Sequence, residues 1–555
     1  MSTVVEVRNL HVTALTDSGR EVEILKGIDL DIADGETLAL IGESGSGKTT
    51  LALTLMGYCR AGCSITGGQI RIAGRDVTVM SETERAALRG KQVAYVPQSA
   101  AAAFDPLQKI IDQVTEVARI HGLMPVRAAR KKAVELFRAL ALPDPETIGA
   151  RYPHQVSGGQ LQRLSAAMAL MGDPEIMIFD EPTTALDVTT QIEVLRAFKS
   201  VIRSRNMAGV YVSHDLAVVA QMADRILVMQ DGEMQEIGTT QRILTNPQHE
   251  YTEALIAAVH PAARALAEPR VGEADQPILE VERITAGYGS VGKGKDRMPQ
   301  MIAVKDVSLR LMPGHNLGVI GESGSGKSTL ARTIAGLLPQ ASGSVRFKGV
   351  ELPTTVQQRT KGQLRELQIV FQSADTALNP NKSVRSILSR PLRFYHGLKG
   401  AEINARVLEL LDKVHLPRSL MHRLPGELSG GQKQRVNLAR ALAAEPQVVL
   451  CDEITSALDT VVAAAILELL GELQRELGLS YVFISHDLKT IEAICDQVMV
   501  MYHGVKVEEM PTSRMKEGAE HPYSRRLISS VPQLDTGWLD GVTQEPGDLP
   551  AAMDG

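Results

Sequence analysis

Two glycine-rich stretches carry the residue types that bind phosphate. Residues 42–49 read GESGSGKT and residues 321–328 read GESGSGKS. Glycines let backbone N–H groups turn toward an anion without a Cβ in the way, while the lysine and the hydroxyl reach phosphate and Mg²⁺. Each stretch follows an apolar run and precedes a helical pattern, which is the context that such a loop requires. The residues predicted to surround phosphate are Gly42, Glu43, Ser44, Gly45, Ser46, Gly47, Lys48, Thr49 and Thr50 in the first stretch, and Gly321, Glu322, Ser323, Gly324, Ser325, Gly326, Lys327, Ser328 and Thr329 in the second.

Two pairs of adjacent acidic residues each end an apolar run. Asp180 and Glu181 follow IMIF, and Asp452 and Glu453 follow VVLC. In α/β proteins, ligands bind at the carboxyl ends of the strands, so these carboxylates are placed at such an edge. The first acid of each pair fits the coordination shell of Mg²⁺. The second acid is the candidate catalytic residue that orients or deprotonates an attacking water.

The motifs occur twice in the same order. VSGGQ at Val156 and LSGGQ at Leu428 are 272 residues apart, as are the two acidic pairs and the two SHD motifs of His214 and His486. The glycine-rich stretches are 279 residues apart. Four motifs nearly in register indicate an internal duplication. A chain of 555 residues is also too long for one hydrophobic core and long enough for two domains of roughly 250 residues.

Composition places the domain boundary and the chain ends. We expect a first domain at residues 1–260, a linker at 261–277 and a second domain at 278–534, because Pro, Ala and charged residues dominate the linker and no apolar periodicity persists there. A tail at 535–555, rich in Gly, Pro and Asp, is expected to be flexible.

Short apolar runs predict buried parallel strands in each half. They lie at 37–41, 176–179 and 210–212 in the first half, and at 317–320, 448–451 and 481–484 in the second. Helical patterns lie between them, for example at 128–140 and 461–477. Strands that alternate with helices predict an α/β fold with a mainly parallel sheet.

The SGGQ motifs narrow the class of protein. A serine hydroxyl and two glycine N–H groups at a helix start offer a second anion-binding surface, formed by Ser157, Gly158, Gly159 and Gln160, and by Ser429, Gly430, Gly431 and Gln432. Together with the P-loops and acidic pairs, this pattern resembles the ATP-binding-cassette (ABC) ATPases over nearly the whole chain. The resemblance implies two P-loop NTPase domains in tandem, each with a mixed, mainly parallel core sheet and a helical subdomain.

The resemblance also implies two ATP sites, because the signature of one ABC domain closes over the P-loop ATP of the other. One site would combine Lys48, Thr49, Gln98, Asp180, Glu181 and His214 with Ser429, Gly430 and Gly431. The other would combine Lys327, Ser328, Gln372, Asp452, Glu453 and His486 with Ser157, Gly158 and Gly159.

Single residues match further family motifs. Gln98 in YVPQ and Gln372 in IVFQ match the glutamine that senses Mg²⁺ and water. The resemblance makes His214 and His486 the switch histidines that contact the γ-phosphate. Asp187 and Asp459, in ALD, match the loop that couples the two sites.

Three departures from the family pattern concern local contacts. Tyr288 stands where an aromatic ring stacks on adenine, but the first half has Ala14 and Leu15 there. Val156 replaces the leucine of the signature, and Ile454 replaces a proline after the second catalytic glutamate. None of these changes removes a catalytic group, so we expect both sites to hydrolyse ATP.

The segments after each cassette indicate the subfamily. EHPYSRRLISSVPQLD at 520–535 and QHEYTEALIAAV at 248–259 resemble the region that follows the cassette in oligopeptide, dipeptide and nickel importers. The resemblance implies two integral-membrane permease partners, an extracytoplasmic binding protein and a place at the cytoplasmic face of the inner membrane. The cargo could be peptides, glutathione-like thiols, nickel chelates or opine-like compounds. The cysteine-rich extension of that family is missing here, so no iron–sulfur cluster is expected.

Composition weighs against other classes. A net charge of −6 gives no basic footprint for nucleic acid. The pair Cys59 and Cys63 has no second ligand pair nearby, and we interpret it as packing rather than as a metal site. No secretory signal and no membrane-spanning apolar run is evident.

Two other readings of the tandem cassettes stay open. A soluble translation factor would be expected to carry a charged helical arm between its cassettes, and 260–277 shows none. A tandem sugar importer usually lacks part of the second catalytic set, whereas Lys327, Glu453 and His486 are all present.

Overall fold

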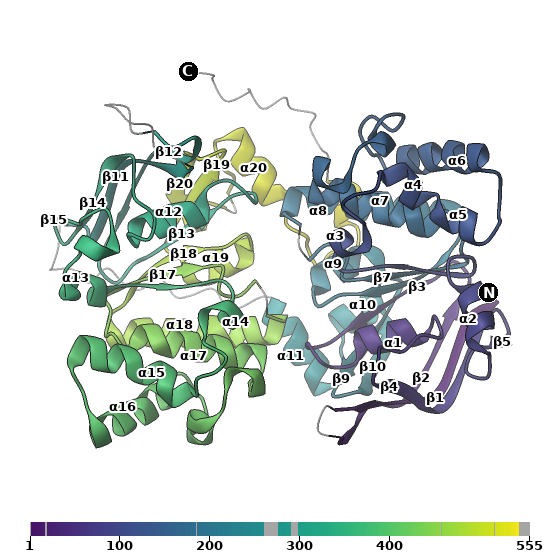
Figure 1. The fold of residues 1–555 in the computed structure, drawn as a ribbon, viewed down its shortest axis with the longest axis horizontal. Coiled ribbons are helices and arrows are strands. Elements are labelled where there is room, and N and C mark those ends of the chain that lie inside the picture. Colours follow the sequence, from purple (N-terminus) through teal and green to yellow (C-terminus); the bar gives the residue numbers. More distant parts are fainter. Residues whose placement is uncertain are drawn as a thin grey trace. The chain divides into compact units, whose positions relative to one another are not determined.

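The computed structural model describes residues 2–16, 19–184, 186–259, 276–289, 298–456, 458–515 and 517–542 (Figure 1). The chain forms two units. The first holds the chain up to Val259 together with a segment that begins at Pro532, and the second holds the chain from His260 to Val531. The linker predicted at 261–277 lies almost wholly outside the described residues. Among the helices that the structure describes, none is long and apolar enough to cross a bilayer.

The first unit contains a four-stranded antiparallel sheet, in the order β2-β1-β4-β5, and a six-stranded sheet, in the order β10-β9-β3-β8-β7-β6. In the larger sheet only the edge strand β10 runs antiparallel to its neighbour. The strands are β1 (Thr3–Leu15), β2 (Glu21–Ala33), β3 (Thr37–Ile41), β4 (Cys63–Ile72), β5 (Arg75–Asp76), β6 (Val93–Val96), β7 (Ile176–Asp180), β8 (Ala208–Val212), β9 (Arg225–Gln230) and β10 (Glu233–Thr239).

The second unit repeats this architecture. Its sheets have the orders β12-β11-β14-β15 and β16-β17-β18-β13-β19-β20, and in the larger one β20 is the antiparallel edge strand. Its strands are β11 (Leu279–Tyr288), β12 (Met301–Leu311), β13 (Asn316–Ile320), β14 (Ser342–Phe347), β15 (Val350–Glu351), β16 (Leu367–Val370), β17 (Val448–Asp452), β18 (Ser480–Ile484), β19 (Gln497–Tyr502) and β20 (Val505–Pro511). The predicted α/β fold with mixed, mainly parallel core sheets is confirmed in both units.

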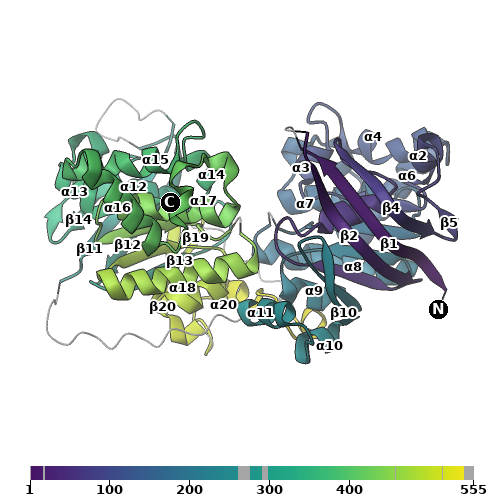
Figure 2. The same cartoon turned by 90° about the horizontal axis from the view of Figure 1, so that it is seen from below.

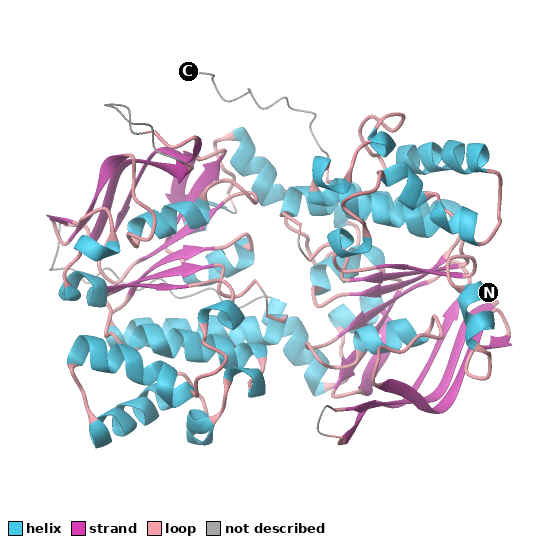
Figure 3. Ribbon diagram, in the orientation of Figure 1, coloured by secondary structure: helices cyan, strands magenta, loops and turns pink. Residues whose placement is uncertain are grey.

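The central strands are apolar throughout because both faces of the sheet are covered. Every residue of β3, β7 and β8 is buried, and so is every residue of β13, β17 and β18. Helices lie on both sides of the larger sheet in each unit (Figure 3). A strand that is buried on both faces has no solvent side on which to place polar residues, so its sequence reads as a continuous apolar run.

The helix that follows each P-loop packs between the two sheets of its unit. Leu51 of α1 (Lys48–Thr54) shares one core with Val7 of the antiparallel sheet and Leu40 of the larger sheet. In the second unit Leu330 of α12 (Lys327–Ile334) belongs to the corresponding core. Figure 2 shows β1, β2 and β4 side by side in the antiparallel sheet. This packing fixes the start of α1 and α12, where phosphate is expected.

Further helices carry the remaining motifs. The predicted helices at 128–140 and 461–477 correspond to α6 (Val126–Ala139) and α18 (Thr460–Leu477). Asp187 is the N-cap of helix α8 (Val188–Arg205) and Asp459 is the N-cap of α18, and each carboxylate accepts the N–H three residues later. The sequence therefore starts both helices directly after the ALD motif. The other helices that concern the site are α7 (Gly158–Leu170), α9 (Leu216–Met222), α11 (Glu250–Val259), α17 (Gly430–Leu442), α19 (Leu488–Ile494), α20 (Pro522–Ser529) and α21 (Trp538–Gly541).

The C-terminal segment from Pro532 differs from the expected flexible tail. Gln221 of α9 donates to the carbonyls of Gln533 at 2.8 Å and Asp535 at 2.7 Å, and it accepts the N–H of Leu539 at 2.9 Å. Leu539 is buried. The segment is therefore packed on the first unit as far as Val542, and residues 543–555 lie outside the described part of the chain.

Candidate functional site

Each P-loop joins a buried strand to a helix, as predicted. Residues 42–47 link β3 to α1, and Thr50 lies in the first turn of α1. The buried Lys48 donates from Nζ to the carbonyls of Gly42 at 2.8 Å and Glu43 at 2.6 Å. Lys327 makes the same two contacts with Gly321 and Glu322, both at 2.8 Å. The ammonium groups therefore lie at the loops, where a phosphate chain would be bound.

The first glycine of each loop is required by its backbone. Gly42 has φ 148° and Gly321 has φ 150°. A Cβ at these positions would lie 2.0 Å from the carbonyl oxygen of Met229 and 2.2 Å from that of Met501. No L side chain fits against a backbone oxygen at that distance, so only glycine lets the loop pass the neighbouring strand.

A hydroxyl and a carboxylate lie together where Mg²⁺ is expected. Thr49 donates from Oγ1 to Oδ1 of Asp180 at 3.0 Å, and Ser328 donates from Oγ to Oδ1 of Asp452 at 2.7 Å. Burial raises the pKa of both carboxyl groups. Mg²⁺ prefers oxygen ligands and is commonly held by one or two carboxylates together with phosphate oxygens and water. These donor pairs fit that ion.

The predicted catalytic residues come together in the first unit. Glu181 accepts a hydrogen bond from Nε2 of Gln98 at 2.9 Å, and its other oxygen lies 3.2 Å from Nδ1 of His214. The three residues come from different parts of the unit, since Gln98 follows β6, Glu181 follows β7 and His214 follows β8.

The second unit has the same arrangement with one looser contact. Glu453 accepts from Nε2 of Gln372 at 2.8 Å, while Nδ1 of His486 lies 3.6 Å from its carboxylate. Gln372 also donates to Oγ of Ser456 at 3.3 Å. The grouping of glutamine, glutamate and histidine is thus present twice.

The histidine contact changes the acidity of the glutamate. Burial acts to raise the pKa of Glu181, but the hydrogen bond and charge of His214 offset it, so the pKa falls below its ordinary value. The close approach of His486 is the main cause that lowers the pKa of Glu453. In return the pKa values of His214 and His486 are raised. Both glutamates are therefore ionised near neutral pH, which a general base requires.

Both glutamates have a backbone conformation that is rare outside glycine. Glu181 and Glu453 each have φ 48°. Their N–H groups donate to the backbone carbonyls of Val212 at 2.9 Å and of Ile484 at 3.0 Å, respectively. A left-handed residue other than glycine costs about 1–3 kcal/mol and is kept only where its surroundings hold it. In both units this backbone conformation sets the direction in which the predicted catalytic carboxylate leaves its strand.

The signature serines begin helices, as expected for an anion-binding surface. Ser157 precedes α7 and accepts the N–H of Gln160 at 3.3 Å, while the Gln160 side chain accepts the N–H of Ser157 at 3.1 Å. Ser429 and Gln432 form the same capping box before α17. Gly158, Gly159, Gly430 and Gly431 form the first turns of these helices.

The aromatic residue predicted to stack on adenine is close to the second P-loop. Tyr288 ends β11, is partly exposed, and its hydroxyl lies 3.1 Å from Oγ1 of Thr329. In the first unit β1 ends at Leu15, which is exposed and has no ring. Only the second unit therefore has an aromatic ring at this strand end.

Sequence reasoning missed three tyrosines at the site. Tyr95 donates to Oδ2 of Asp180 at 2.7 Å, and the corresponding residue in the second cassette is Ile369. The hydroxyls of Tyr251 and Tyr523 accept the backbone N–H groups of Glu43 and Glu322. For Tyr95 a signal existed, because it lies three residues before Gln98 in YVPQ.

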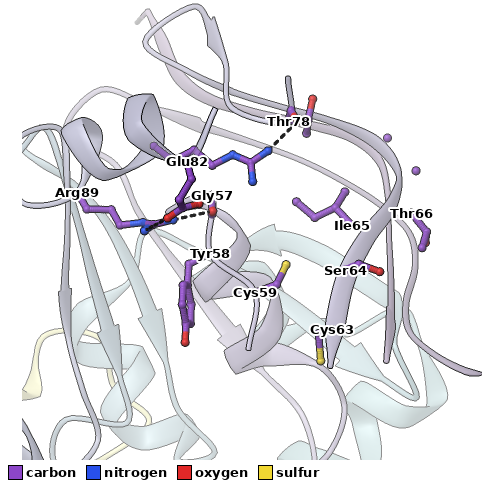
Figure 4. Close-up of a pocket in the computed structure, with 13 residues that line it drawn as sticks. Gly57, Tyr58, Cys59, Cys63, Ser64, Ile65, Thr66, Thr78, Glu82 and Arg89 are labelled. Carbon is purple, nitrogen blue, oxygen red and sulfur yellow. Dashed lines mark hydrogen bonds and ion pairs between the residues drawn. The ribbon is translucent and has the colours of Figure 1, made fainter. Parts of the chain in front are cut away.

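Cys59 and Cys63 line an open pocket of about 680 Å³ (Figure 4), and no residue of the P-loop lines it. Its cations are already engaged, since Arg89 pairs with Glu82 at 2.7 Å and Arg85 donates to the carbonyl of Thr78 at 2.9 Å. Burial raises the pKa of the Cys59 thiol, which disfavours the thiolate. In the described parts of the chain no group of three or more His, Cys, Asp or Glu side chains is arranged to hold a metal.

Comparisons with known proteins identify the family of this chain. Residues 25–184 and 304–456 match the ABC transporter family, and residues 235–285 and 507–555 match the oligopeptide/dipeptide transporter C-terminal region. The glutathione import ATP-binding protein GsiA of Shigella dysenteriae is 37% identical over 95% of this chain and 89% of the relative, and that of Escherichia coli K12 is 36% identical over the same shares. A dimeric structure of MJ0796, a bacterial ABC transporter cassette, aligns with 42% of this chain and 98% of its own at 27% identity and a TM-score of 0.38. The chain belongs to the ABC transporter family and is the ATP-hydrolysing subunit of an importer, with two cassettes in tandem.

Proposed function

We propose that this chain hydrolyses ATP at both P-loops to energise the import of small peptides, glutathione included. The observation that carries the proposal is the identity of 37% to a glutathione import ATP-binding protein over 95% of the chain. Two matches to the oligopeptide/dipeptide C-terminal region, one in each half, add support for peptides as the cargo class.

The site residues divide the chemistry among themselves. The ammonium groups of Lys48 and Lys327 turn from the loop carbonyls to phosphate oxygens when ATP binds. Both ammonium groups are cationic and already lie at their loops. Glu181 and Glu453 accept a proton from the attacking water, while Gln98, Gln372, His214 and His486 orient these carboxylates. Mg²⁺ held by Thr49 with Asp180, and by Ser328 with Asp452, would neutralise charge on the phosphates.

The proposed partners are two integral-membrane permeases and an extracytoplasmic binding protein, which would hold the chain at the cytoplasmic face of the inner membrane. The test is a pull-down of the tagged chain from detergent-solubilised membranes, followed by mass spectrometry. Co-purification of two multi-span proteins is the expected result. Recovery of ribosomal proteins in their place would favour a soluble translation factor and contradict the proposal.

The cargo class is tested by uptake in native cells that lack the chain. Radiolabelled glutathione and a labelled tripeptide without a thiol are supplied separately, with the unsubstituted chain restored as the reference. Restored uptake of either compound supports peptide import, and the preferred compound identifies the cargo. If restoring the chain leaves the uptake of both compounds unchanged, the proposed cargo class is wrong.

A further inference from the structure

The segment after each cassette contains a tyrosine that contacts the P-loop of its own unit. Tyr251 lies in the first turn of α11, and its hydroxyl oxygen accepts the N–H of Glu43 at 3.0 Å. Tyr523 lies in the first turn of α20 and accepts the N–H of Glu322 at 2.9 Å. Both tyrosines are buried, with 8% and 1% of their surface exposed. The same contact with the P-loop therefore occurs in both units.

A carboxylate fixes the chain just before each tyrosine. Glu236 of β10 is buried and accepts the N–H groups of Gln248 at 3.1 Å and His249 at 3.2 Å. Helix α11, which carries Tyr251, lies beside α10 (Thr240–Thr245) and β10 (Figure 2).

The second unit holds its tyrosine in the same way. Glu508 of β20 accepts the N–H groups of Glu520 at 2.7 Å and His521 at 3.1 Å. The ring of His521 then accepts the N–H of Tyr523 at 3.2 Å, as His249 does for Tyr251. In each unit the glutamate and the histidine therefore hold the tyrosine in a position from which its hydroxyl contacts the P-loop.

The peptide groups around Glu43 are held from two sides. Tyr251 binds its N–H, and Lys48 binds its carbonyl at 2.6 Å. The lysine contact would weaken when the ammonium turns to phosphate, because the three N–H groups of Lys48, which all face the loop, would then be shared with the ligand. The hydroxyl of Tyr251 accepts the backbone N–H of Glu43, the second residue of the loop, and does not have to leave it for phosphate to bind.

We propose that Tyr251 and Tyr523 are positioning residues that hold each P-loop in its phosphate-binding shape, so that the C-terminal region of each cassette sets the affinity of that cassette for ATP. This inference rests on the proposed binding of ATP at both P-loops. A loop that is competent for only part of the time binds ligand more weakly in proportion to that fraction. Loss of one hydrogen bond of ordinary strength corresponds to about a three- to tenfold change.

The test uses the full chain with Tyr251→Phe, Tyr523→Phe and both changes together. Phenylalanine keeps the ring and removes only the hydroxyl. Binding of Mg²⁺ with the non-hydrolysable analogue β,γ-imido-ATP is measured by calorimetry, and the KM and kcat for ATP are measured separately. Each single change should weaken one of two sites about three- to tenfold, and the double change should weaken both, with KM raised and kcat within about twofold.

The matched control is Tyr481→Phe in the second cassette. Tyr481 is also buried, and its hydroxyl donates to the carbonyl of Leu470 at 3.2 Å rather than to a P-loop. This variant should lose comparable thermal stability and keep the affinity of the unsubstituted chain. The double variant Glu236→Gln, Glu508→Gln is a second test. It disturbs the hydrogen bonds that hold the chain just before each tyrosine, so it should also weaken binding of the ATP analogue.

The outcomes separate the two proposals. Unchanged affinity in the double tyrosine variant would overturn the positioning role, as would a fall in kcat with KM unchanged. An unsubstituted chain that binds no analogue would overturn the proposed ATP sites themselves.

Discussion

At the residue scale, the two cassettes share the contacts of their predicted catalytic glutamates and differ in the residues around them. Both glutamates meet a glutamine and a histidine, but Asp180 also receives the hydroxyl of Tyr95, where the second cassette has Ile369. Burial, followed by the charge of Asp180, raises the pKa of Tyr95, so its hydroxyl stays a donor at neutral pH. Asp180, the predicted Mg²⁺ ligand of the first cassette, therefore accepts a hydrogen bond on each of its two oxygens.

Tyr95→Phe should lower the free energy of unfolding by about 1–3 kcal/mol, because the buried Asp180 loses a donor to its charged form. Chemical denaturation without nucleotide or Mg²⁺ measures the change. A loss below about 0.3 kcal/mol would show that the hydrogen bond contributes nothing to the folded chain.

The contact between His214 and Glu181 should make stability depend on pH. The pKa of His214 is raised in the folded chain, so its contribution is fully present below the ordinary histidine value of 6.5 and is lost as pH rises through the raised value. The lowered pKa of Glu181 removes the contribution only when pH falls through that lower value. The difference in Tm between the unsubstituted chain and His214→Gln should therefore be larger near pH 6 than near pH 9. A difference that grows with pH would contradict the sign.

At the element scale, the ends of β1 and β11 differ beside otherwise equivalent P-loop helices. Tyr288 ends β11 and contacts Thr329 of α12, whereas β1 ends at Leu15. Tyr288→Ala should weaken ATP binding in the second cassette by more than Ala14→Tyr alters binding in the first, because only the first change removes a ring near the loop. Binding calorimetry of both variants decides the point. Equal effects would remove the adenine-stacking role of Tyr288.

The sequence predicted the elements with strong local patterns. The central strands β3, β7 and β8 agree within a few residues, because a strand buried on both faces shows an unbroken apolar run. The antiparallel sheet of β1, β2 and β4 was not predicted, since its strands mix buried and exposed residues irregularly around register shifts.

The parts of the site that the sequence missed depend on distant contacts. Tyr251 and Glu43 are 208 residues apart in the sequence, and no local sequence pattern predicts a hydrogen bond between such distant residues. The left-handed backbone of Glu181 is likewise imposed by the loop that carries it, not by its residue type. By contrast, the P-loop and its acid were predictable because glycine, lysine and carboxylate occur where phosphate chemistry requires them.

At the scale of the whole molecule, the chain passes between its two units a second time near its C-terminal end. The segment from Pro532 belongs to the first unit, although it follows the second cassette in sequence. Lys199 of α8 pairs with Asp540 at 3.0 Å, and Arg196 donates to the carbonyl of Val542. Together with Gln221, these residues fasten the segment to α8 and α9. The corresponding residues of the second cassette are Glu468, Gly471 and Ala493, which offer none of these groups.

Trp538, the single tryptophan of the chain, reports on this segment. Gln221→Glu keeps the size of the side chain but turns a carboxylate oxygen toward the carbonyls of Gln533 and Asp535. The segment should detach, with a red-shifted Trp538 emission and stronger quenching by acrylamide. Ala493→Glu, at the corresponding position of the second cassette, is the matched control and should leave the emission unchanged. Identical spectra for the unsubstituted chain and Gln221→Glu would mean that the segment is not seated on α9 in solution.

The measurement that tests the central claim most directly is ATP turnover and ATP binding by the chain with Glu181→Gln and Glu453→Gln combined. The amide keeps the shape of each carboxylate but is not a base, so hydrolysis should fall to the background rate while ATP still binds. Turnover equal to that of the unsubstituted chain would contradict the account, because neither glutamate would then be the catalytic base.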